Sequence, residues 1–273
     1  MKRILFVLTV LFLVSCDKEP VNPSTPDTPT HPLADGAVIE NAVTDYDGNT
    51  YNAIVIGEQV WMQSNLRTTH YDDGTEIPLE SEVSDSIACY YYEDHGYNVA
   101  DYGYLYNWKA VMRDSPTTNT NPSGVQGICP TGWHVPSDAE WVQLEDYLQS
   151  QSQYYSCDHH HVAKALASET GWNLYNPDMD ITNPQHILCC VGNPCDNNNA
   201  TGFSAFPAGY YGAFYNGCFI ACIGQDANFW STTEYQDVSF TQVLGRLLNY
   251  SSPSINRCYN SKRFGYSVRC LRN

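Results

Sequence analysis

One segment in the middle of the chain places its apolar residues at helical spacing. Ser137 and Glu140 form an S-x-x-E capping box, in which each side chain bonds a backbone amide that the first turn of a helix leaves unpaired. Trp141, Leu144 and Leu148 follow at i, i+3 and i+7, which puts them on one helical face. The pattern therefore predicts a helix that begins at Ser137 and buries this face.

Nearer the N-terminus, two apolar stretches flank a turn signal. Residues Val43–Tyr51 carry β-branched and aromatic side chains on both sides of an Asp-Gly pair, and the apolar run Ala53–Gly57 follows. This arrangement is typical of a β-hairpin. The stretch also matches the first half of a calcium-binding loop, but Thr50 and Ile56 stand where such a loop needs Gly and Glu. The prediction is a hairpin.

Further along the chain, helical spacing gives way to strand patterns. Leu105, Trp108 and Met112 are spaced for a short amphipathic helix, and Val162–Ala167 indicates another that ends before Gly171. The last third predicts five strands, at Phe203–Phe206, Tyr210–Phe214, Phe229–Thr233, Val243–Leu248 and Tyr266–Leu271. Helices in the first two-thirds and antiparallel strands afterwards predict an α+β fold.

The first fifteen residues are typical of an export signal. Two basic residues precede the apolar run Ile4–Val14, which is too short to span a bilayer, so residues 1–15 are predicted to be a signal peptide. The sequence Leu-Val-Ser-Cys that ends at Cys16 resembles a lipobox. We therefore expect cleavage before Cys16 and a diacylated Cys16 that anchors the protein to a membrane. The alternative is an ordinary signal peptide with an incidental cysteine.

A tether is predicted to follow the anchor. Asp17–Glu19 resembles the acidic signal that sends Bacteroidetes lipoproteins to the outer face of the cell. Residues 20–32 contain five prolines and almost nothing apolar, so they cannot bury enough surface to fold. We assign residues 16–36 to the lipidated cysteine and a Pro/Thr-rich tether, and 37–273 to one domain, because no second linker follows. The expected location is the outer membrane, facing the cell exterior.

The charge of the chain excludes one large class of partners. The sequence has 13 basic and 30 acidic residues, and removal of Lys2 and Arg3 with the signal peptide leaves a formal charge of −19. Such a surface repels a phosphate backbone, so no nucleic-acid partner is expected. Acidity also suits solubility outside the cell and attracts divalent cations without defining a specific site.

The cysteine content fits an exported protein. Ten of the eleven cysteines remain once Cys16 is set aside, and an even number in an exported chain favours disulfides over free thiols. The residues alone leave the pairing open. A zinc cluster is the competing interpretation, but the chain has no C-x-x-C pair, and the adjacent Cys189 and Cys190 suit tetrahedral coordination poorly.

Six separated motifs carry a family resemblance. They are Trp61–Leu66 with its extension to Thr75, Tyr102–Trp108, Cys129–Trp141, Gly202–Gly209, Trp230–Glu234 and Phe264–Cys270. In this order they resemble the Fibrobacter succinogenes major paralogous domain over roughly residues 43–273, apart from an inserted Cys/His/Asn-rich stretch at 150–196. The resemblance implies a bacterial surface lipoprotein with a C-type-lectin-like fold, and it implies no general biochemical activity.

A specific disulfide comes with this resemblance. By similarity to lectin-like folds, Cys129 is expected to pair with Cys270 and to join the loop before the long helix to the last strand. The remaining cysteines are then expected to be local loop staples, namely Cys89, Cys157, Cys189, Cys190, Cys195, Cys218, Cys222 and Cys258.

Two groups of polar residues are candidate metal ligands. Cys157–His161 ends in three successive histidines, which cannot all face one ion from a helix, so a solvated loop beside a disulfide is the preferred interpretation. Asn176–Asp178 with Asp180 and Asn183, and later Asp196–Asn199, offer oxygen ligands for calcium, although such clusters usually form turns. No metal ligand or cofactor is assigned, and calcium is kept as an alternative.

The sequence lacks the usual catalytic signatures. It contains no G-x-S-x-G, no H-E-x-x-H and no phosphate-binding glycine loop. The acidic pairs Asp72–Asp73 and Glu93–Asp94 are adjacent, so they do not face each other as the carboxylates of a glycosidase do. His134 is expected to be a hydrogen-bonded structural histidine rather than a general base. No catalytic residue is assigned.

Tyrosine is plentiful, with 21 residues, and tyrosines make rigid amphipathic surfaces suited to sugars or proteins. We therefore expect a non-enzymatic cell-surface lipoprotein whose lectin-like domain serves adhesion or binds a glycan or another surface protein. One alternative is an enzyme that acts on extracellular polysaccharide, and another is a structural subunit of a surface or fimbrial assembly. The binding residues are not identified by sequence.

Overall fold

The alternating segment near the N-terminus folds as the expected hairpin. β1 (Val38–Thr44) pairs antiparallel with β2 (Thr50–Ile56). The carboxylate of Asp45 accepts hydrogen bonds from the backbone amide of Asn49 at 2.9 Å and from the hydroxyl of Tyr51 at 2.6 Å. The residues that imitate a calcium loop therefore shape the turn between the two strands.

The computed structural model describes residues 33–92, 97–175, 188–193, 198–236 and 241–273, which belong to one unit that begins at Leu33. The predicted signal peptide, the lipidated Cys16 and the tether up to residue 32 lie outside the described residues. In the described part, no helix is long and apolar enough to cross a membrane.

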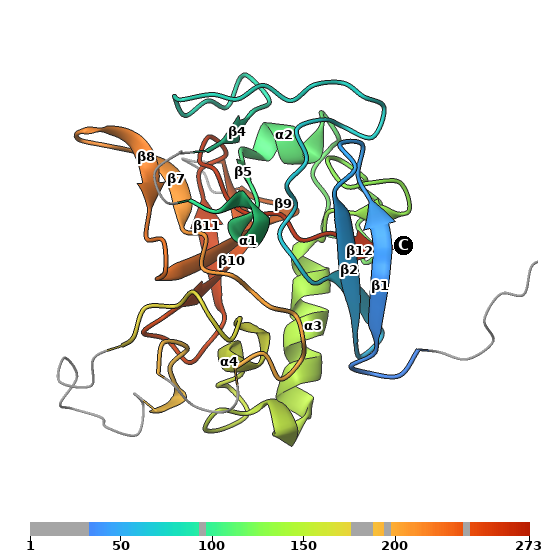
Figure 1. The fold of residues 1–273 in the computed structure, drawn as a ribbon, viewed down its shortest axis with the longest axis vertical. Coiled ribbons are helices and arrows are strands. Elements are labelled where there is room, and N and C mark those ends of the chain that lie inside the picture. Colours follow the sequence, from blue (N-terminus) through green and yellow to red (C-terminus); the bar gives the residue numbers. More distant parts are fainter. Residues whose placement is uncertain (1–32, 93–96, 176–187, 194–197, 237–240) are drawn as a thin grey trace, which may run out of the picture. The chain divides into compact units, whose positions relative to one another are not determined.

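The hairpin forms one end of a five-stranded antiparallel sheet that joins both ends of the domain. β3 (Gln59–Met62) extends the hairpin, β12 (Leu271–Arg272) pairs with β3, and β6 (Trp133–His134) completes the order β1-β2-β3-β12-β6 (Figure 1). The last strand is thus inserted between segments that lie far earlier in the chain.

A second sheet and smaller elements complete an α+β fold. The second sheet has the order β11-β10-β9, and two ribbons pair β4 with β5 and β7 with β8. The bounds of these strands are β4 (Tyr90–Tyr91), β5 (Leu105–Tyr106), β7 (Tyr210–Phe214), β8 (Gly217–Ala221), β9 (Asp226–Gln236), β10 (Thr241–Asn249) and β11 (Asn256–Asn260). The helices in the described part are α1 (Val99–Tyr102), α2 (Trp108–Met112), α3 (Asp138–Ser150) and α4 (Ala163–Leu166), with a 3-10 turn at Ser152–Tyr154.

The capping box starts α3 as the sequence predicts. The hydroxyl of Ser137 accepts the backbone amide of Glu140 at 3.2 Å, and the Glu140 carboxylate accepts the amide of Ser137 at 2.8 Å. Trp141, Leu144 and Leu148 are all buried, so the expected apolar face is confirmed. This face packs in one core cluster with residues of β2, β3 and β9, and Figure 1 shows α3 between the two sheets.

Aromatic rings fill the core beside α3. The ring centroids of Trp61 and Trp141 lie 4.6 Å apart, and both rings make edge contacts with Phe203. The indole nitrogen of Trp141 donates to the carbonyl of Trp230 at 3.2 Å, which ties the helix to β9. Because buried indoles need a partner for their N–H group, this bond fixes the ring as well as hiding it.

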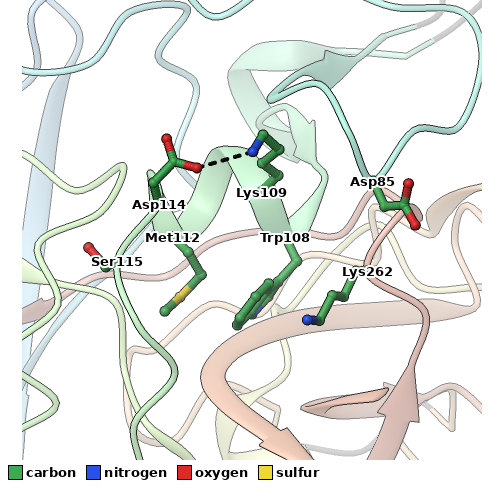
Figure 2. A pocket seen from close by; sticks show the side chains of 7 residues that line it. All are labelled: Asp85, Trp108, Lys109, Met112, Asp114, Ser115 and Lys262. Carbon is green, nitrogen blue, oxygen red and sulfur yellow. Dashed lines mark hydrogen bonds and ion pairs between the residues drawn. The ribbon is translucent and has the colours of Figure 1, made fainter. Parts of the chain in front are cut away.

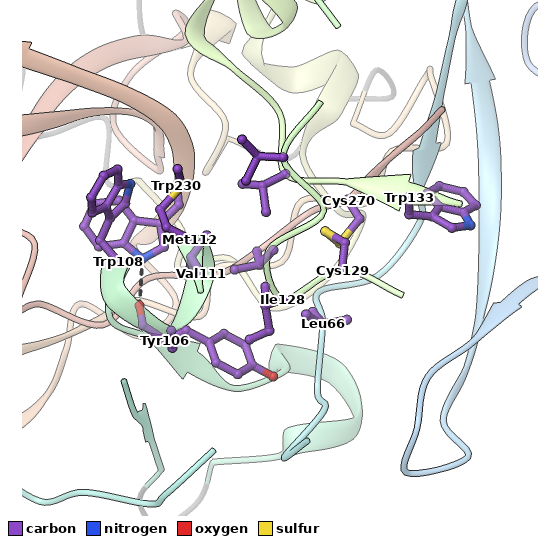
Figure 3. Close-up of a cluster of buried hydrophobic side chains, with 14 of the residues drawn as sticks. Leu66, Tyr106, Trp108, Val111, Met112, Ile128, Cys129, Trp133, Trp230 and Cys270 are labelled. Carbon is purple, nitrogen blue, oxygen red and sulfur yellow. Dashed lines mark hydrogen bonds between the residues drawn. A yellow bond between two sulfur atoms is a disulfide. The ribbon is translucent and has the colours of Figure 1, made fainter. Parts of the chain in front are cut away.

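A second core cluster surrounds a disulfide between Cys129 and Cys270, which is the pair that the resemblance implies (Figure 3). The two Cα atoms lie 5.9 Å apart and both cysteines are completely buried. Gly127 lies close to the backbone of α2, since a Cβ there would stand 2.1 Å from the carbonyl oxygen of Val111. The bridge therefore joins the loop before α3 to the end of the chain inside the core.

Most of the predicted elements in the last third are present, but two of them differ. Phe203–Phe206 is not a strand, because Phe203 packs into the aromatic core and Ala205 makes only a single bridge to Ala167. Of the predicted strand Tyr266–Leu271, only Leu271 belongs to a strand, and the rest crosses between sheets through isolated bridges. In the described part of the chain, the helices α1 to α4 precede the strands of the last third, as expected, and the predicted N-terminal hairpin joins β3 in the main sheet.

The expectation of local disulfide staples holds only in part. Cys157 and Cys189 form a second disulfide, but Cys89, Cys218, Cys222 and Cys258 are thiols. Cys218 and Cys222 are four residues apart along extended chain at the end of β8, so their Cα atoms are separated by about 13 Å, well beyond disulfide reach. The thiol of Cys89 is buried between the amide of Asn107 and the hydroxyl of Tyr91. Cys195 lies outside the described residues.

A buried ion pair links α3 to the main sheet. His134 is 3% exposed, and its Nε2 lies 2.7 Å from the Glu140 carboxylate while its Nδ1 lies 2.6 Å from the side-chain oxygen of Asn273. Burial opposes the charged imidazolium, but the hydrogen bond and negative charge of Glu140 outweigh it and raise the pKa of His134. The residue is hydrogen-bonded through both ring nitrogens, as expected for a structural histidine.

Truncation of Trp141 should be costly. Trp141→Ala removes a buried indole from the aromatic core, and we expect a loss of about 3–5 kcal/mol in the free energy of unfolding. For a domain of this size the melting temperature should fall by roughly 10 °C. Thermal unfolding followed by circular dichroism measures this fall. The matched control is Val142→Ala at the next position, which is 39% exposed and should change the melting temperature little.

The two disulfides should differ in their contribution to stability. The Cys129–Cys270 bridge spans 141 residues and the Cys157–Cys189 bridge spans 32. Loop-closure entropy predicts about 5 kcal/mol for the longer loop and about 4 kcal/mol for the shorter one. Urea unfolding of the two Cys-to-Ser double variants should show the larger loss in free energy of unfolding for the Cys129–Cys270 variant.

Non-reducing peptide mapping should recover Gly127–Trp133 linked to Ser267–Cys270, and alkylation of either cysteine in the native protein would refute the pairing.

The His134 ion pair should make stability depend on pH. A raised pKa means that the folded protein binds the proton more tightly than the unfolded chain, whose histidine has a pKa near 6.5. The stabilisation is therefore complete below about pH 6.5 and is lost as the pH rises through the raised value. Melting temperatures of the wild type and of His134→Gln, measured from acidic to alkaline pH, should converge as the pH rises. A constant difference between them would contradict the ion pair.

Candidate ligand-binding site

A pocket of about 170 Å3 opens beside α2, and we call it the Trp108 pocket (Figure 2). Its walls come from the loop before β4, from α2 with the turn that follows it, and from the segment after β11. The lining residues are Asp85, Trp108, Lys109, Met112, Asp114, Ser115 and Lys262. The pocket is smaller than a typical drug-sized ligand site, so it suits one small group of a larger ligand.

Asn107 sets two walls of the pocket at once. It is completely buried, and its side-chain oxygen accepts the backbone amide of Ala110 at 2.9 Å, which caps α2. Its side-chain nitrogen donates to the carbonyls of Ser84 at 2.8 Å and Ile87 at 2.6 Å. The start of α2 and the loop that carries Asp85 are therefore held by the same side chain.

Trp108 and Met112 form the apolar floor, and both side chains extend in the same direction in Figure 2. The indole nitrogen of Trp108 donates to the carbonyl of Ser231 at 2.9 Å, and its backbone amide donates to the carbonyl of Lys262 at 3.0 Å. The ring is therefore anchored on β9 and on the segment after β11, and a ligand meets a floor that is already in place.

Lys262 lies against this floor. Its ammonium nitrogen is 4.5 Å from the centroid of the Trp108 ring, and it also forms an ion pair with Glu234 on β9. A cation over an indole face is attracted by the ring electrons. Two interactions thus fix the direction of this ammonium group at the pocket.

The opposite rim comes from the turn after α2. Arg113 and Asp114 both have left-handed backbone angles, with φ of 47° and 59°, so the chain reverses directly after the helix. The reversal brings the Asp114 carboxylate to 3.1 Å from the ammonium group of Lys109. Both side chains are well exposed, so the pair contributes little stability and its groups are available to a ligand.

The rim is charged on all sides but nearly balanced. Asp85 is exposed, and its carboxylate makes no hydrogen bond with any described residue. Together with Lys109, Asp114 and Lys262 it surrounds the floor with donors and acceptors of both signs (Figure 2). An apolar floor inside such a rim suits a group with an apolar face and a polar edge.

A larger cavity of about 340 Å3 lies beside His134. Both ring nitrogens of His134 are already hydrogen-bonded, to Glu140 and to Asn273, so neither is free to act as a base. The other lining residues carry no charged side chain, and they are Pro122, Gly124, Gln126 and Trp133. This cavity therefore has the weaker case for a binding site.

The predicted metal candidates do not converge in the described part of the chain. Cys157 is bound to Cys189, the rings of His159 and His160 lie 3.7 Å apart, and His161 faces Asp158 at 3.2 Å. Among the described residues, no group of three His, Cys, Asp or Glu side chains is placed to hold a metal ion.

The calcium candidates fall mostly outside the described residues, which exclude Asn176–Asp178, Asp180, Asn183 and Asp196. Asn199 is described, and it shapes a turn. Its side-chain oxygen accepts the backbone amide of Ser204 at 2.8 Å and its nitrogen donates to the Ser204 hydroxyl at 2.9 Å.

The adjacent acidic residues have separate partners. Asp72 bonds Thr131 and Asp73 bonds Arg113, so these two carboxylates do not share one site. The pair Glu93–Asp94 lies outside the described residues. Among the tyrosines, the Tyr91 ring stacks on Tyr211 with centroids 4.2 Å apart, and both are buried.

Sequence reasoning missed the rim of the Trp108 pocket. Trp108 and Met112 were placed on a short helix, but Asp85, Asp114 and Lys262 had no motif or spacing to mark them. They come from three separate loops, and only the folded chain brings them together. The scarcity of lysine in this acidic chain is the one signal that the sequence offered.

Comparison with known proteins places the chain in a family. Residues 54–272 match the Fibrobacter succinogenes major domain, which covers most of the chain and agrees with the resemblance of the six motifs. The search of curated proteins and the search of solved structures each found no match. The family comparison carries no activity with it. The chain belongs to the Fibrobacter succinogenes major domain family.

Proposed function

We propose that this protein is a cell-surface lipoprotein whose lectin-like domain binds a glycan at the Trp108 pocket without catalysing a reaction. The observation that carries the proposal is the fixed indole of Trp108 inside a rim of charged side chains. A sugar ring has an apolar C–H face and a hydroxylated edge. The floor suits the face, and the ammonium and carboxylate groups suit the hydroxyls as hydrogen-bond donors and acceptors.

The charge balance of the pocket favours a neutral sugar unit. Lys109 and Lys262 each have a carboxylate partner, so neither ammonium group is left to demand an anionic ligand. The Asp114 carboxylate is paired with the ammonium group of Lys109, which leaves Asp85 as a single unpaired carboxylate in the described lining and makes the pocket a poor cage for calcium. Binding is therefore expected to be independent of calcium.

The enzymatic alternative has less support. Catalysis of glycoside hydrolysis needs two carboxyl groups on either side of the bond that is cleaved. Asp114 is held by Lys109 on the open side of the pocket, and Asp85 lies exposed on a separate loop. The proposal is therefore binding without bond cleavage, and the experiment below separates the two.

The assembly alternative requires a strand edge that another chain can extend. β1 is the edge of the five-stranded sheet, but its pairing is irregular between Ile39 and Val43, and Asn41 has a φ of 50°. A bulge of this kind interrupts the row of backbone groups that strand addition uses. This edge therefore favours a single copy over a fibre.

Removal of the rim charges should abolish glycan binding. The purified protein is applied to a glycan array with calcium and with a chelator, and the bound sugars are then measured by calorimetry. We expect binding in both conditions and at least a tenfold loss of affinity in the double variant Asp85→Asn/Lys109→Gln. Both residues are exposed at the rim, so the fold should be kept.

The matched control is Glu58→Gln/Arg272→Gln, which makes the same charge changes at exposed positions outside the pocket. Its affinity should equal that of the wild type. An equal loss of glycan affinity in both double variants would show that the Trp108 pocket is not the binding site. Recovery of shortened oligosaccharides after incubation would show that the protein cleaves the sugar, and it would refute the proposal of binding without catalysis.

The proposed lipid anchor has its own test. Cys16→Ser removes the only residue that the lipobox pattern offers for acylation, so we expect the protein to leave the membrane fraction. Protease added to intact cells should remove the domain if it faces the exterior. Retention of the variant in the membrane would refute lipidation, and complete protection from protease would refute surface exposure.

A further inference from the structure

The ribbon of β7 and β8 carries apolar side chains on a face where a surface element usually has polar ones. Side chains alternate along β7, so Tyr211 faces the body of the protein, where it packs in a buried cluster with Ile220. Tyr210, Gly212 and Phe214 occupy the opposite face, where Tyr210 packs against the core cluster that contains Tyr266, Gly212 is buried and Phe214 is exposed. A ribbon with one face on the core normally exposes polar side chains on the other.

The outward face is aromatic instead. Phe219 of β8 is paired with Gly212 and stacks on Phe214 with ring centroids 4.4 Å apart, and the rings of Tyr210 and Phe214 fill the space where Gly212 lacks a side chain. Tyr210 lies 5.9 Å from Phe214 and 6.2 Å from Phe264. At the tip between the strands, Tyr215 is fully exposed. The ribbon extends away from the three-stranded sheet at the upper left of Figure 1.

The ribbon is also uncharged in a strongly acidic protein. No Asp, Glu, Lys or Arg occurs in Pro207–Gln225, whereas the whole chain has a formal charge of −17. Charged groups border it at its edges: the Asp226 carboxylate is hydrogen-bonded to Cys222, the Glu82 carboxylate lies 3.4 Å from the thiol of Cys218, and the Arg263 guanidinium lies 5.7 Å from the ring of Phe264. The ribbon is therefore a surface that meets little electrostatic repulsion from an anionic or neutral layer.

We propose that this aromatic ribbon docks on a lipid surface and seats the domain on the membrane that anchors it. Phenylalanine and tyrosine together favour the boundary between acyl chains and headgroups, where one end of the ring is apolar and the other is wet. Residues 17–32 span at most about 55 Å when fully extended, so a lipid on Cys16 would hold Leu33, where the domain begins, within that distance of the bilayer. The lipid anchor is part of the proposed function, and membrane docking by the ribbon rests on it.

The experiment measures lipid binding without the anchor. The chain from Asp17 onward keeps the tether and the whole unit from Leu33. It is mixed with phosphatidylcholine vesicles and separated by flotation at low and high salt. We expect it to float with the vesicles in both, because an uncharged aromatic surface binds by apolar burial. Phe214→Ser/Phe219→Ser should lower the bound fraction about tenfold or more, since each ring contributes separately.

The control is Tyr235→Ser/Tyr259→Ser, which removes an exposed aromatic pair from β9 and β11 and should float like the wild type. Equal melting temperatures, or the single variant Tyr215→Ser at the fully exposed tip, exclude a folding defect as the cause. Absence of flotation, or flotation unchanged by the ribbon variants, overturns the proposal. So does a dimer in solution that only the ribbon variants dissociate, because the occupant is then a second copy. None of these outcomes depends on glycan binding or on lipidation of Cys16.

Discussion

The buried guanidinium of Arg269 hydrogen-bonds backbone carbonyls of segments that contribute to both core clusters. Its guanidinium donates to the carbonyls of Met62 at 2.9 Å, Phe203 at 2.5 Å and Ser204 at 2.5 Å. Met62 ends β3, and Phe203 and Ser204 lie outside the strands, so Arg269 supplies donors at places where strand pairing stops, and a buried carbonyl without a partner is costly. The ring of Phe203 lies 4.5 Å from the guanidinium carbon. Burial lowers the pKa of Arg269 to about 9. Because this value is still above neutral pH, the guanidinium remains charged there.

The position of this arginine explains why a loop-rich chain has a defined core. Arg269 lies directly before Cys270, so the bridge to Cys129 and the bonds to Met62 and Phe203 act on the same short segment. That segment continues into β12, which pairs with β3 on one side and β6 on the other. Three parts of the chain that are distant in sequence are thereby fixed against one another. A sheet with two-residue strands could not hold them by ladder bonds alone.

The family motifs supply residues of the core rather than most of the pocket. The motifs that carry the resemblance supply the buried residues, including Trp61, Trp141, Trp230 and Arg269. Of the residues that line the Trp108 pocket, only Trp108 lies in a motif. The family pattern therefore specifies the frame and the pocket floor. The rim residues lie outside the motifs, so family membership alone does not identify a ligand.

Local chemistry made part of this structure predictable. The capping box and the apolar face of α3 are set by residues within one helix, and the β1–β2 hairpin is set by its own turn. Segments that need distant partners were misjudged. Phe203–Phe206 has strand-like composition, yet it serves the aromatic core, and β12 is short because the preceding residues cross between sheets. The pocket rim was invisible for the same reason, since Asp85 and Lys262 meet only after folding.

The β7–β8 ribbon and the Trp108 pocket both have aromatic rings at or near the surface. Exposed strand positions elsewhere include polar ones such as Arg257 and one aromatic pair, Tyr235 and Tyr259. On the ribbon the rings of Phe214 and Tyr215 are exposed, and in the pocket the largely buried Trp108 lines the floor. Folding gains nothing from either exposure, because apolar burial is the main force that stabilises the chain. These are the two places at which we propose contact with something outside the chain, a sugar at one and a lipid surface at the other.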